Sequence, residues 1–269
     1  MDNRAIGVFD SGLGGLTGVR ELINLLPQES TVYFGDTGRV PYGSRSNQTI
    51  IRYVQEDIRF LLTFDIKLIM VACGTASSVA LPHIPDCPVP VIGVVEPAVK
   101  RALEVTKNNR IGVIGTSGTI NNGMYERLLR ENRPDVTVFS NACPLFVPLV
   151  ENGLTDGEIA YLAAKEYLAP LKEKQIDTLI LGCTHYPLLV GAIRAFLGDD
   201  VTLIDPGYET ARFVRDHLTN HDMLSDRKQG DHQYFVSDSI ENFSKNAGAF
   251  LQEEIGQQIQ KIEIERFGV

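Results

Sequence analysis

Two of the four cysteines, Cys73 and Cys183, each end a short apolar run, KLIMVAC (67–73) and DTLILGC (177–183). Such runs predict buried strands. A thiol at a strand end can lie at the N-terminus of the next helix, where the helix dipole lowers its pKa. A thiolate facing a thiol across a substrate forms an acid–base pair, in which one removes a proton from a carbon atom and the other returns one to the opposite face. The alternative, two ordinary core cysteines, stays open at this point.

The remaining cysteines, Cys87 and Cys143, each precede a proline and are interpreted as small apolar side chains. The chain starts with MDNRAIGVFDSG, which has no basic segment followed by a long apolar one, so we expect no secretory signal and a cytoplasmic protein. Thiols stay reduced in that compartment, so we expect no disulfides.

Further polar residues follow other apolar runs. Because the carboxyl ends of parallel strands meet at one edge of a sheet, we expect these residues to lie near the cysteines. Helix N-termini at that edge favour a carboxylate substrate. The residues are Asp10, Ser11, Gly35-Asp36-Thr37-Gly38, Thr116, Thr119, Thr184 and His185.

Other kinds of site fit less well. The glycine-rich DSGLGG (10–15) has Thr17 where a dinucleotide-binding loop needs glycine, which favours a tight turn that brings the backbone close to a small ligand. The triplets DSG and DTG (36–38) resemble those of aspartic proteases, but those proteins are all-β. Cys183 and His185 form a C-x-H pair without a second pair to complete a metal site, so we expect no metal.

Composition excludes further classes. The 269 residues are 43% hydrophobic and carry a formal net charge of −9, and no run of Lys or Arg stands out, so we expect no nucleic-acid partner. No stretch approaches the roughly 18 consecutive apolar residues of a membrane span.

Short β-branched runs alternate with segments of helical period, which predicts an α/β fold with mostly parallel sheets flanked by helices. An internal similarity indicates two such units, although chance resemblance between short strands would also explain it: Ile111 lies 105 residues after Ile6, and Cys183 lies 110 residues after Cys73. The proline-rich stretch 81–97 is the candidate linker, and the tail is expected to return to the first unit. The predicted domains are therefore 1–96 plus 208–269, carrying Cys73, and 97–207, carrying Cys183.

Five motifs, in order, resemble those of the glutamate racemase family. They are FDSGLGGL (9–16), YFGDTGRVPYG (33–43), VACGTAS (71–77), CPLFVPLVE (143–151) and LGCTHYP (181–187). The resemblance implies two pseudo-symmetric domains with the active site in the cleft between them. It also implies an isomerase that makes D-glutamate from L-glutamate for peptidoglycan, without pyridoxal phosphate or metal, as a possible homodimer.

Carried over by motif, the resemblance makes Cys73 and Cys183 the two bases, one for each enantiomer. Asp10 and His185 support them, and Glu151 matches an acidic residue near the second cysteine. The segments expected to contact substrate contain Asp10, Ser11, Tyr42, Gly43, Gly74, Thr75, Thr119, Thr184 and His185.

One residue departs from the family pattern. Gly74 stands where the family usually has Asn after the first cysteine, so the substrate head group loses a side-chain donor and acceptor there. Two alternatives to glutamate racemisation remain, the first because pocket shape sets the preferred side-chain length and the second because of Gly74. The chain could be an aspartate racemase or related amino-acid racemase of the same superfamily, or a glutamate-binding protein with impaired turnover.

Overall fold

Two separate sheets organise the molecule, which is described here from a computed structural model covering residues 1–84, 86–252, 255 and 259–268. Every strand pairing in both sheets is parallel. The first sheet has the order β10-β9-β2-β1-β3-β4 and the second the order β6-β5-β7-β8. The first comprises β1 (Ala5–Asp10), β2 (Thr31–Gly35), β3 (Ile66–Val71), β4 (Val91–Gly93), β9 (His232–Val236) and β10 (Ile259–Lys261), and the second β5 (Arg110–Gly115), β6 (Thr137–Ala142), β7 (Thr178–Gly182) and β8 (Thr202–Ile204).

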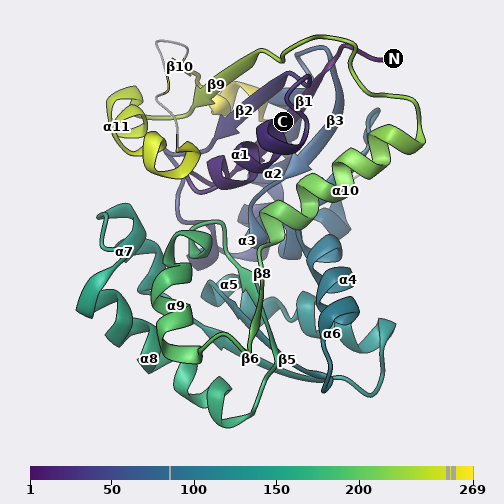
Figure 1. Ribbon diagram of the computed structural model, residues 1–269. Helices are drawn as coiled ribbons and strands as arrows, with labels where there is room; N and C mark the ends of the chain where they lie inside the picture. The colour runs from purple at the N-terminus through teal and green to yellow at the C-terminus, as the bar shows by residue number, and fades with distance from the viewer. Residues whose placement is uncertain (85, 253–254, 256–258, 269) are drawn as a thin grey trace.

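Helices cover both sheets, and the two units stack one above the other (Figure 1). The predicted α/β class is therefore confirmed. The α-helices are α1 (Leu16–Leu25), α2 (Asn47–Leu61), α3 (Gly74–Val79), α4 (Val95–Val105), α5 (Ser117–Asn122), α6 (Met124–Asn132), α7 (Phe146–Glu151), α8 (Gly157–Glu173), α9 (Val190–Leu197), α10 (Pro206–Asn220) and α11 (Ile240–Leu251). Short 3₁₀ turns are η1 (Tyr42–Ser44), η2 (Leu81–His83), η3 (Tyr186–Leu189) and η4 (Ile264–Phe267).

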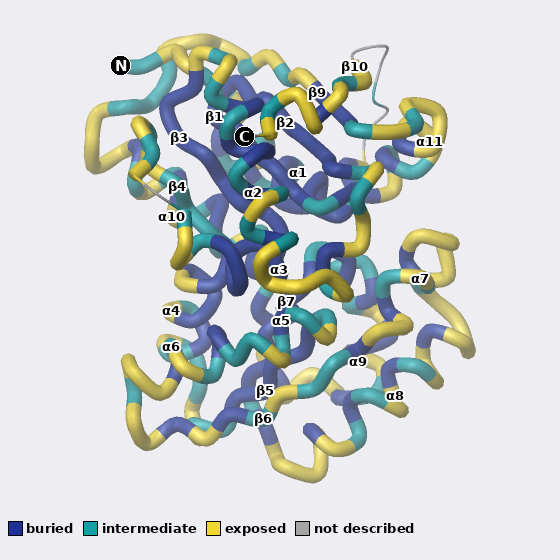
Figure 2. The backbone as a smooth tube through the Cα atoms, turned by 180° about the vertical axis from the view of Figure 1, so that it is seen from behind, coloured by how far each residue is buried: buried dark blue, intermediate teal, exposed yellow. Residues whose placement is uncertain are grey.

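Each strand sends alternate side chains to opposite faces of its sheet. In β1, Val8 enters the core beneath α1, while Phe9 enters the core beneath α2, which also holds Val54 and Ile58. The strands are therefore buried on both faces, as their near-continuous apolar sequences require, and the centres of both units are dark blue in Figure 2.

The structure corrects the expectation for the proline-rich stretch. The stretch 81–97, interpreted as a linker, contains β4, which pairs with β3 as an edge strand of the first sheet. The tail does return to the first unit, where β9 pairs with β2, and it ends in the turn η4. The exact domain boundaries stay a prediction, and residues 85, 253–254, 256–258 and 269 of the first predicted domain lie outside the described residues. Among the described residues, no helix has the length and apolar character needed to cross a bilayer.

An aromatic cluster binds the returning tail to the first sheet. The ring of Phe60 in α2 has its centroid 5.3 Å from that of Phe235 in β9 and 5.4 Å from that of Phe267 in η4. Both contacts are close to edge-on, the favoured geometry for aromatic pairs.

Replacing Phe235 with Ala is expected to reduce the free energy of unfolding by about 3–5 kcal/mol, because a buried ring is lost and a cavity remains. Urea denaturation measures this. The matched control is Phe213→Ala, whose ring is 40% exposed and whose loss should cost much less. Equal losses in the two variants would contradict the packing described for the tail.

Candidate active site

The two cysteines of interest lie at the carboxyl ends of strands from different sheets. Cys73 follows β3 and caps α3, where its Sγ accepts a hydrogen bond from the Ala76 amide at 3.4 Å. Cys183 follows β7 and opens the turn into η3, so no α-helix begins directly after it. The sequence therefore predicted correctly that both cysteines end strands. Of the two helix N-termini expected next to them, only the one at Cys73 is present.

Gly74 lies at one of two tight approaches between the units near these cysteines. A Cβ atom placed on Gly74 would lie 2.5 Å from the carbonyl oxygen of Gly182, the residue before Cys183. Beside it, the hydroxyl of Thr75 in the first unit lies 2.9 Å from that of Thr116 and 3.2 Å from that of Thr119 in the second. These contacts bring the ends of β3 and β7 to one interface.

A second contact between the units involves the glycine-rich turn after β1. A Cβ on Gly14 would lie 2.1 Å from the Thr184 hydroxyl and 2.6 Å from the His185 ring. Thr17 donates from its hydroxyl to the Thr184 carbonyl at 3.1 Å. The turn thus brings its backbone close to the residues after Cys183, and only glycine fits at position 14 without a shift.

Asp10 and Ser11 surround Cys73. The Cys73 thiol donates to the Ser11 hydroxyl at 3.5 Å. Burial, followed by the charge of Asp10, raises the pKa of Cys73 to about 12, although the contacts with Ser11 and Ala76 act in the opposite direction. The expected lowering of this pKa by the helix N-terminus is therefore wrong, because burial outweighs it. Cys73 is a thiol at neutral pH.

The surroundings of Cys183 have the opposite charge. Its Sγ lies 3.9 Å from Nδ1 of His185, whose Nε2 lies 3.3 Å from a carboxylate oxygen of Glu151. Burial alone would lower the pKa of His185, but the contacts with Cys183 and Glu151 and the charge of Asp10 raise it to about 10. An imidazolium therefore stands beside the sulfur of Cys183 at neutral pH.

Asp10 is 1% exposed, and one of its carboxylate oxygens accepts a hydrogen bond from the Gly12 amide at 3.0 Å. The other oxygen, Oδ1, is buried and has no hydrogen-bond partner among the residues that the structure describes. Burial raises the pKa of Asp10, and the charge of His185 partly opposes this. A buried acceptor without a partner is costly, so Oδ1 suits a cationic donor supplied by a ligand.

Tyr42 and Gly43 reach the interface in different ways. The Tyr42 hydroxyl is held inside the first unit by Asp36 and Asp57, whereas Gly43 lies against the second unit, with its carbonyl oxygen 2.9 Å from a Cβ placed on Gly118. The Tyr42 phenol therefore forms its hydrogen bonds within the first unit, whereas the backbone of Gly43 contacts the second unit.

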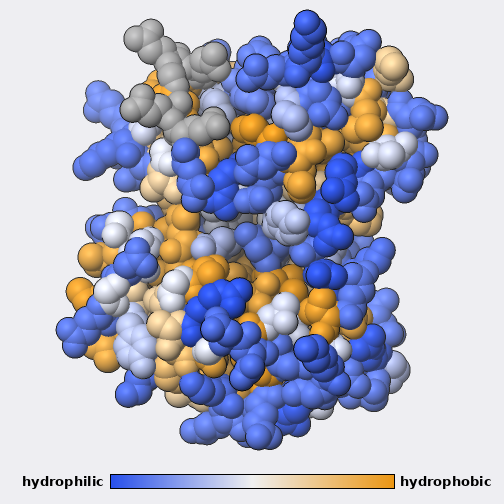
Figure 3. All heavy atoms as spheres, viewed as in Figure 1, coloured by the Kyte–Doolittle hydropathy of each residue, from blue (hydrophilic) through white to orange (hydrophobic). Residues whose placement is uncertain are grey.

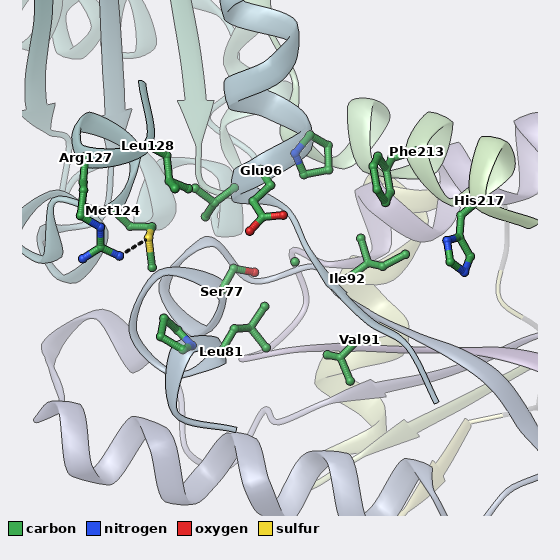
Figure 4. Close-up of a pocket in the computed structure, with 14 residues that line it drawn as sticks. Ser77, Leu81, Val91, Ile92, Glu96, Met124, Arg127, Leu128, Phe213 and His217 are labelled. Atoms are coloured by element: carbon green, nitrogen blue, oxygen red, sulfur yellow. Dashed lines mark hydrogen bonds between the residues drawn. The ribbon is translucent and has the colours of Figure 1, made fainter. Parts of the chain in front are cut away.

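Cavity volume alone would misplace the site. A cavity of about 10 Å³ lies beside Cys183, Gly74 and Asp205. A much larger one, about 630 Å³, lies between β4, α4, α6 and α10 and is lined by apolar side chains together with Ser77, Glu96, Arg127 and His217 (Figure 4). None of the predicted site residues lines the larger cavity.

The fold, two parallel sheets flanked by helices whose strand ends meet at one interface, and the similarities that follow identify the class of this protein as an amino-acid racemase, an isomerase. Residues 19–214 match the family described as Asp/Glu/Hydantoin racemase. The chain belongs to this family and, within it, to the glutamate racemases.

The similarity extends over nearly the whole chain. A glutamate racemase of Geobacter metallireducens is 49% identical over 97% of both chains. The crystal structure of a glutamate racemase isoform from Bacillus anthracis superposes with a TM-score of 0.93 at 41% identity, covering 97% of this chain and 98% of the other. That of the Francisella tularensis enzyme in complex with D-glutamate gives 0.92 at 38% identity, covering 99% and 100%.

Some residues at the site were not among those predicted. Thr116 was expected near the cysteines as a strand-end hydroxyl but not among the substrate contacts, yet it bonds Thr75 across the interface and Thr119 within its own unit. Arg39 and Asp57, which hold the loop before Gly43, carried no signal, because they lie 18 residues apart in a loop and a helix. Internal similarity between the units was the available signal for Thr116, since it is the counterpart of Asp10.

Gly74→Ala is expected to lower the free energy of unfolding by about 1–3 kcal/mol, because the added carbon must push against the backbone at Gly182. Gly191→Ala is the control, since the nearest atom to its Cβ is a carboxylate oxygen of Asp156 at 3.3 Å and alanine favours the helix there. Thermal unfolding of both variants measures the difference. A neutral Gly74→Ala would contradict the tight approach of the units.

His185 should make stability depend on pH. Its folded pKa is raised to about 10 from an ordinary value of 6.5, so its contribution is complete below pH 6.5 and is lost as the pH rises towards 10. The stability advantage of the wild type over His185→Asn should therefore shrink across that range in urea denaturation. A constant advantage would show that His185 is neutral in the folded protein.

Proposed function

We propose that this protein interconverts L- and D-glutamate without a cofactor, with Cys73 and Cys183 as the two acid–base groups. The observation that carries the proposal is the pairing of a protonated thiol at Cys73 with a cysteine beside an imidazolium at Cys183, at the ends of β3 and β7. Membership of the glutamate racemases supports glutamate as the substrate.

In the direction that starts at Cys183, its thiolate takes the α-proton from the substrate, and the electron pair of the C–H bond stays on the α-carbon. Cys73 then gives its proton to the opposite face. The reaction leaves a thiol at Cys183 and a thiolate at Cys73, which is the state needed to act on the other enantiomer. His185, supported by Glu151, stabilises the anion on Cys183.

The residues around the thiols can hold a dicarboxylate amino acid. Asp10, with its unpartnered oxygen, accepts from the substrate ammonium, and Ser11 lies beside it. Hydroxyl groups and backbone amides bind the carboxylates. They come from Thr75, Thr119, Thr184 and His185, from the backbone of Tyr42 and Gly43, and from the amide of Gly74.

The substrate would bind in a cleft between the predicted domains 1–96 plus 208–269 and 97–207. The contacts of Gly74 with Gly182 and of Thr75 with Thr119 then correspond to a closed state. Opening at this interface admits glutamate, and closure excludes water around the thiols. Without a side chain at position 74, the head group is held there by backbone alone.

The product, D-glutamate, would serve peptidoglycan synthesis, and the enzyme would act in the cytoplasm. Four free cysteines at the described positions are compatible with a reducing compartment. The family resemblance in the motifs supports this role in cell-wall formation.

We also propose a homodimer that uses the apolar surface of the second unit. Leu145, Ile159 and Leu162 are more than half exposed and border a groove of about 410 Å³ between α7 and α8. Figure 3 shows apolar side chains gathered on this side of the molecule. A contiguous exposed apolar patch is typical of protein contacts.

Light scattering should give the mass of a dimer for the wild type and of a monomer for a variant carrying Ile159→Glu and Leu162→Glu, because charge is unfavourable in an apolar contact. Leu103→Glu, on α4 in the second unit, is the control and should leave the mass unchanged. A monomeric wild type would end the dimer proposal without affecting the chemistry.

Cys73→Ser and Cys183→Ser should each lower the rate of racemisation by a factor of about 10² or more, because a serine hydroxyl is a far weaker acid than a thiol and is hardly ever ionised to act as a base at neutral pH. Chiral chromatography of each enantiomer incubated with enzyme measures the rate. Cys87→Ser, away from the site, is the control and should retain activity. Near-wild-type rates in both site variants would remove the two-thiol mechanism.

A further inference from the structure

A buried group of charged side chains lies beside the proposed substrate site without entering the chemistry proposed above. It anchors the loop 36–46, which joins β2 to α2 and presents Gly43 to α5 of the second unit. Four of its members are less than a tenth exposed: Asp36, Tyr42, Glu56 and Asp57.

Arg39 is the cation of this group and bonds three carboxylates at once. Its Nε lies 2.6 Å from Asp36, its Nη2 lies 2.9 Å from Oδ1 of Asp57, and its Nη1 contacts Glu56. The guanidinium also lies over the ring of Tyr53, 4.0 Å from the centroid. A second guanidinium, the mostly exposed Arg52, lies with its Nε 3.9 Å from Oε1 of Glu56. Asp36 and Asp57 therefore face Arg39 with an excess of negative charge, which is costly in a buried site.

The Tyr42 hydroxyl requires a proton on one of these carboxylates. Its oxygen is within hydrogen-bond distance of Oδ2 of Asp36 and lies 2.9 Å from Oδ2 of Asp57. A phenol carries one hydrogen and can donate to only one of them. The other carboxyl group must therefore be protonated and donate to the phenol oxygen. If it were ionised, its oxygen and the phenol oxygen would lie in contact with no hydrogen between them.

Asp36 is the anion of the pair, because it already accepts from Arg39 Nε and from the Ser237 hydroxyl at 2.8 Å. Apart from the Tyr42 hydroxyl, the partner of the Asp57 carboxyl group among the described residues is Arg39, on the other oxygen. The hydrogen bonds therefore run from Asp57 to Tyr42 and from Tyr42 to Asp36.

We propose that Asp57 is a protonated, positioning residue: through the chain Asp57–Tyr42–Asp36 it holds the loop 36–46 against the second unit and so sets how tightly substrate binds. Burial, and then the charge of Asp36, raise the pKa of Asp57 well above its ordinary value, which agrees with this assignment. The kinetic consequence rests on the proposed racemisation of glutamate, but the location of the proton does not.

Three variants of the full-length protein test the hydrogen bonds that link Asp57, Tyr42 and Asp36. Asp57→Asn keeps a neutral group that can donate to Tyr42 and accept from Arg39, so KM for glutamate should stay within about threefold of the wild type. Asp36→Asn and Tyr42→Phe each break a hydrogen bond to a charged group, so KM should rise about tenfold or more, with a smaller change in kcat. Asp216→Asn, exposed on α10, is the matched control and should change neither.

Infrared difference spectra locate the proton independently of activity. The wild type minus Asp57→Asn should contain the carbonyl stretch of a protonated carboxyl group, and the wild type minus Asp36→Asn should not. The proposal is overturned if that band is missing from the Asp57→Asn spectrum, or if Asp57→Asn raises KM as much as Tyr42→Phe. If Asp36→Asn does not fold, the KM of Tyr42→Phe and the infrared difference spectrum of Asp57→Asn still test the proposal. A wild type that does not racemise glutamate would refute the proposed function, while the band would still test the proton on Asp57.

Discussion

The contact between the carboxyl ends of two parallel sheets is the constraint on which the rest of the structure depends. Glycines at positions 14 and 74 allow backbone from one unit to lie against backbone and side chains of the other. The threonine hydroxyls of Thr75 and Thr119 then meet across the same interface. Without these contacts, the two cysteines would belong to two unrelated sheet edges, and neither could act on an atom held by the other.

The same contact places the cysteines in unlike electrostatic surroundings. Cys73 is buried beside Asp10, so negative charge on its sulfur is unfavourable, whereas Cys183 lies beside a protonated His185. Pseudo-symmetric backbones therefore carry an asymmetric distribution of charge. The proposed exchange of a proton between the two sulfurs therefore takes place between unlike surroundings, a carboxyl group on one side and an imidazolium on the other.

Much of the fold and part of the site could be predicted from the sequence. Apolar runs ending in Cys73 and Cys183 predicted the strands, because strands buried on both faces need near-continuous apolar residues. Burial around Cys73 was not predictable, since it depends on how Asp10 and Ser11 pack against it. Strand β4 was not predicted, because it lies in a proline-rich stretch that is typical of a linker. An edge strand of three residues needs few amide donors, so nearby prolines are tolerated.

The most direct test of the central claim is the incorporation of solvent deuterium at the α-carbon during the first turnovers in D₂O. Two thiols on opposite faces predict deuterium in the newly formed enantiomer and almost none in the recovered substrate, for both starting enantiomers. Equal early labelling of substrate and product would indicate a single base that exchanges its proton with solvent. That result, or the absence of any labelling, would contradict the account.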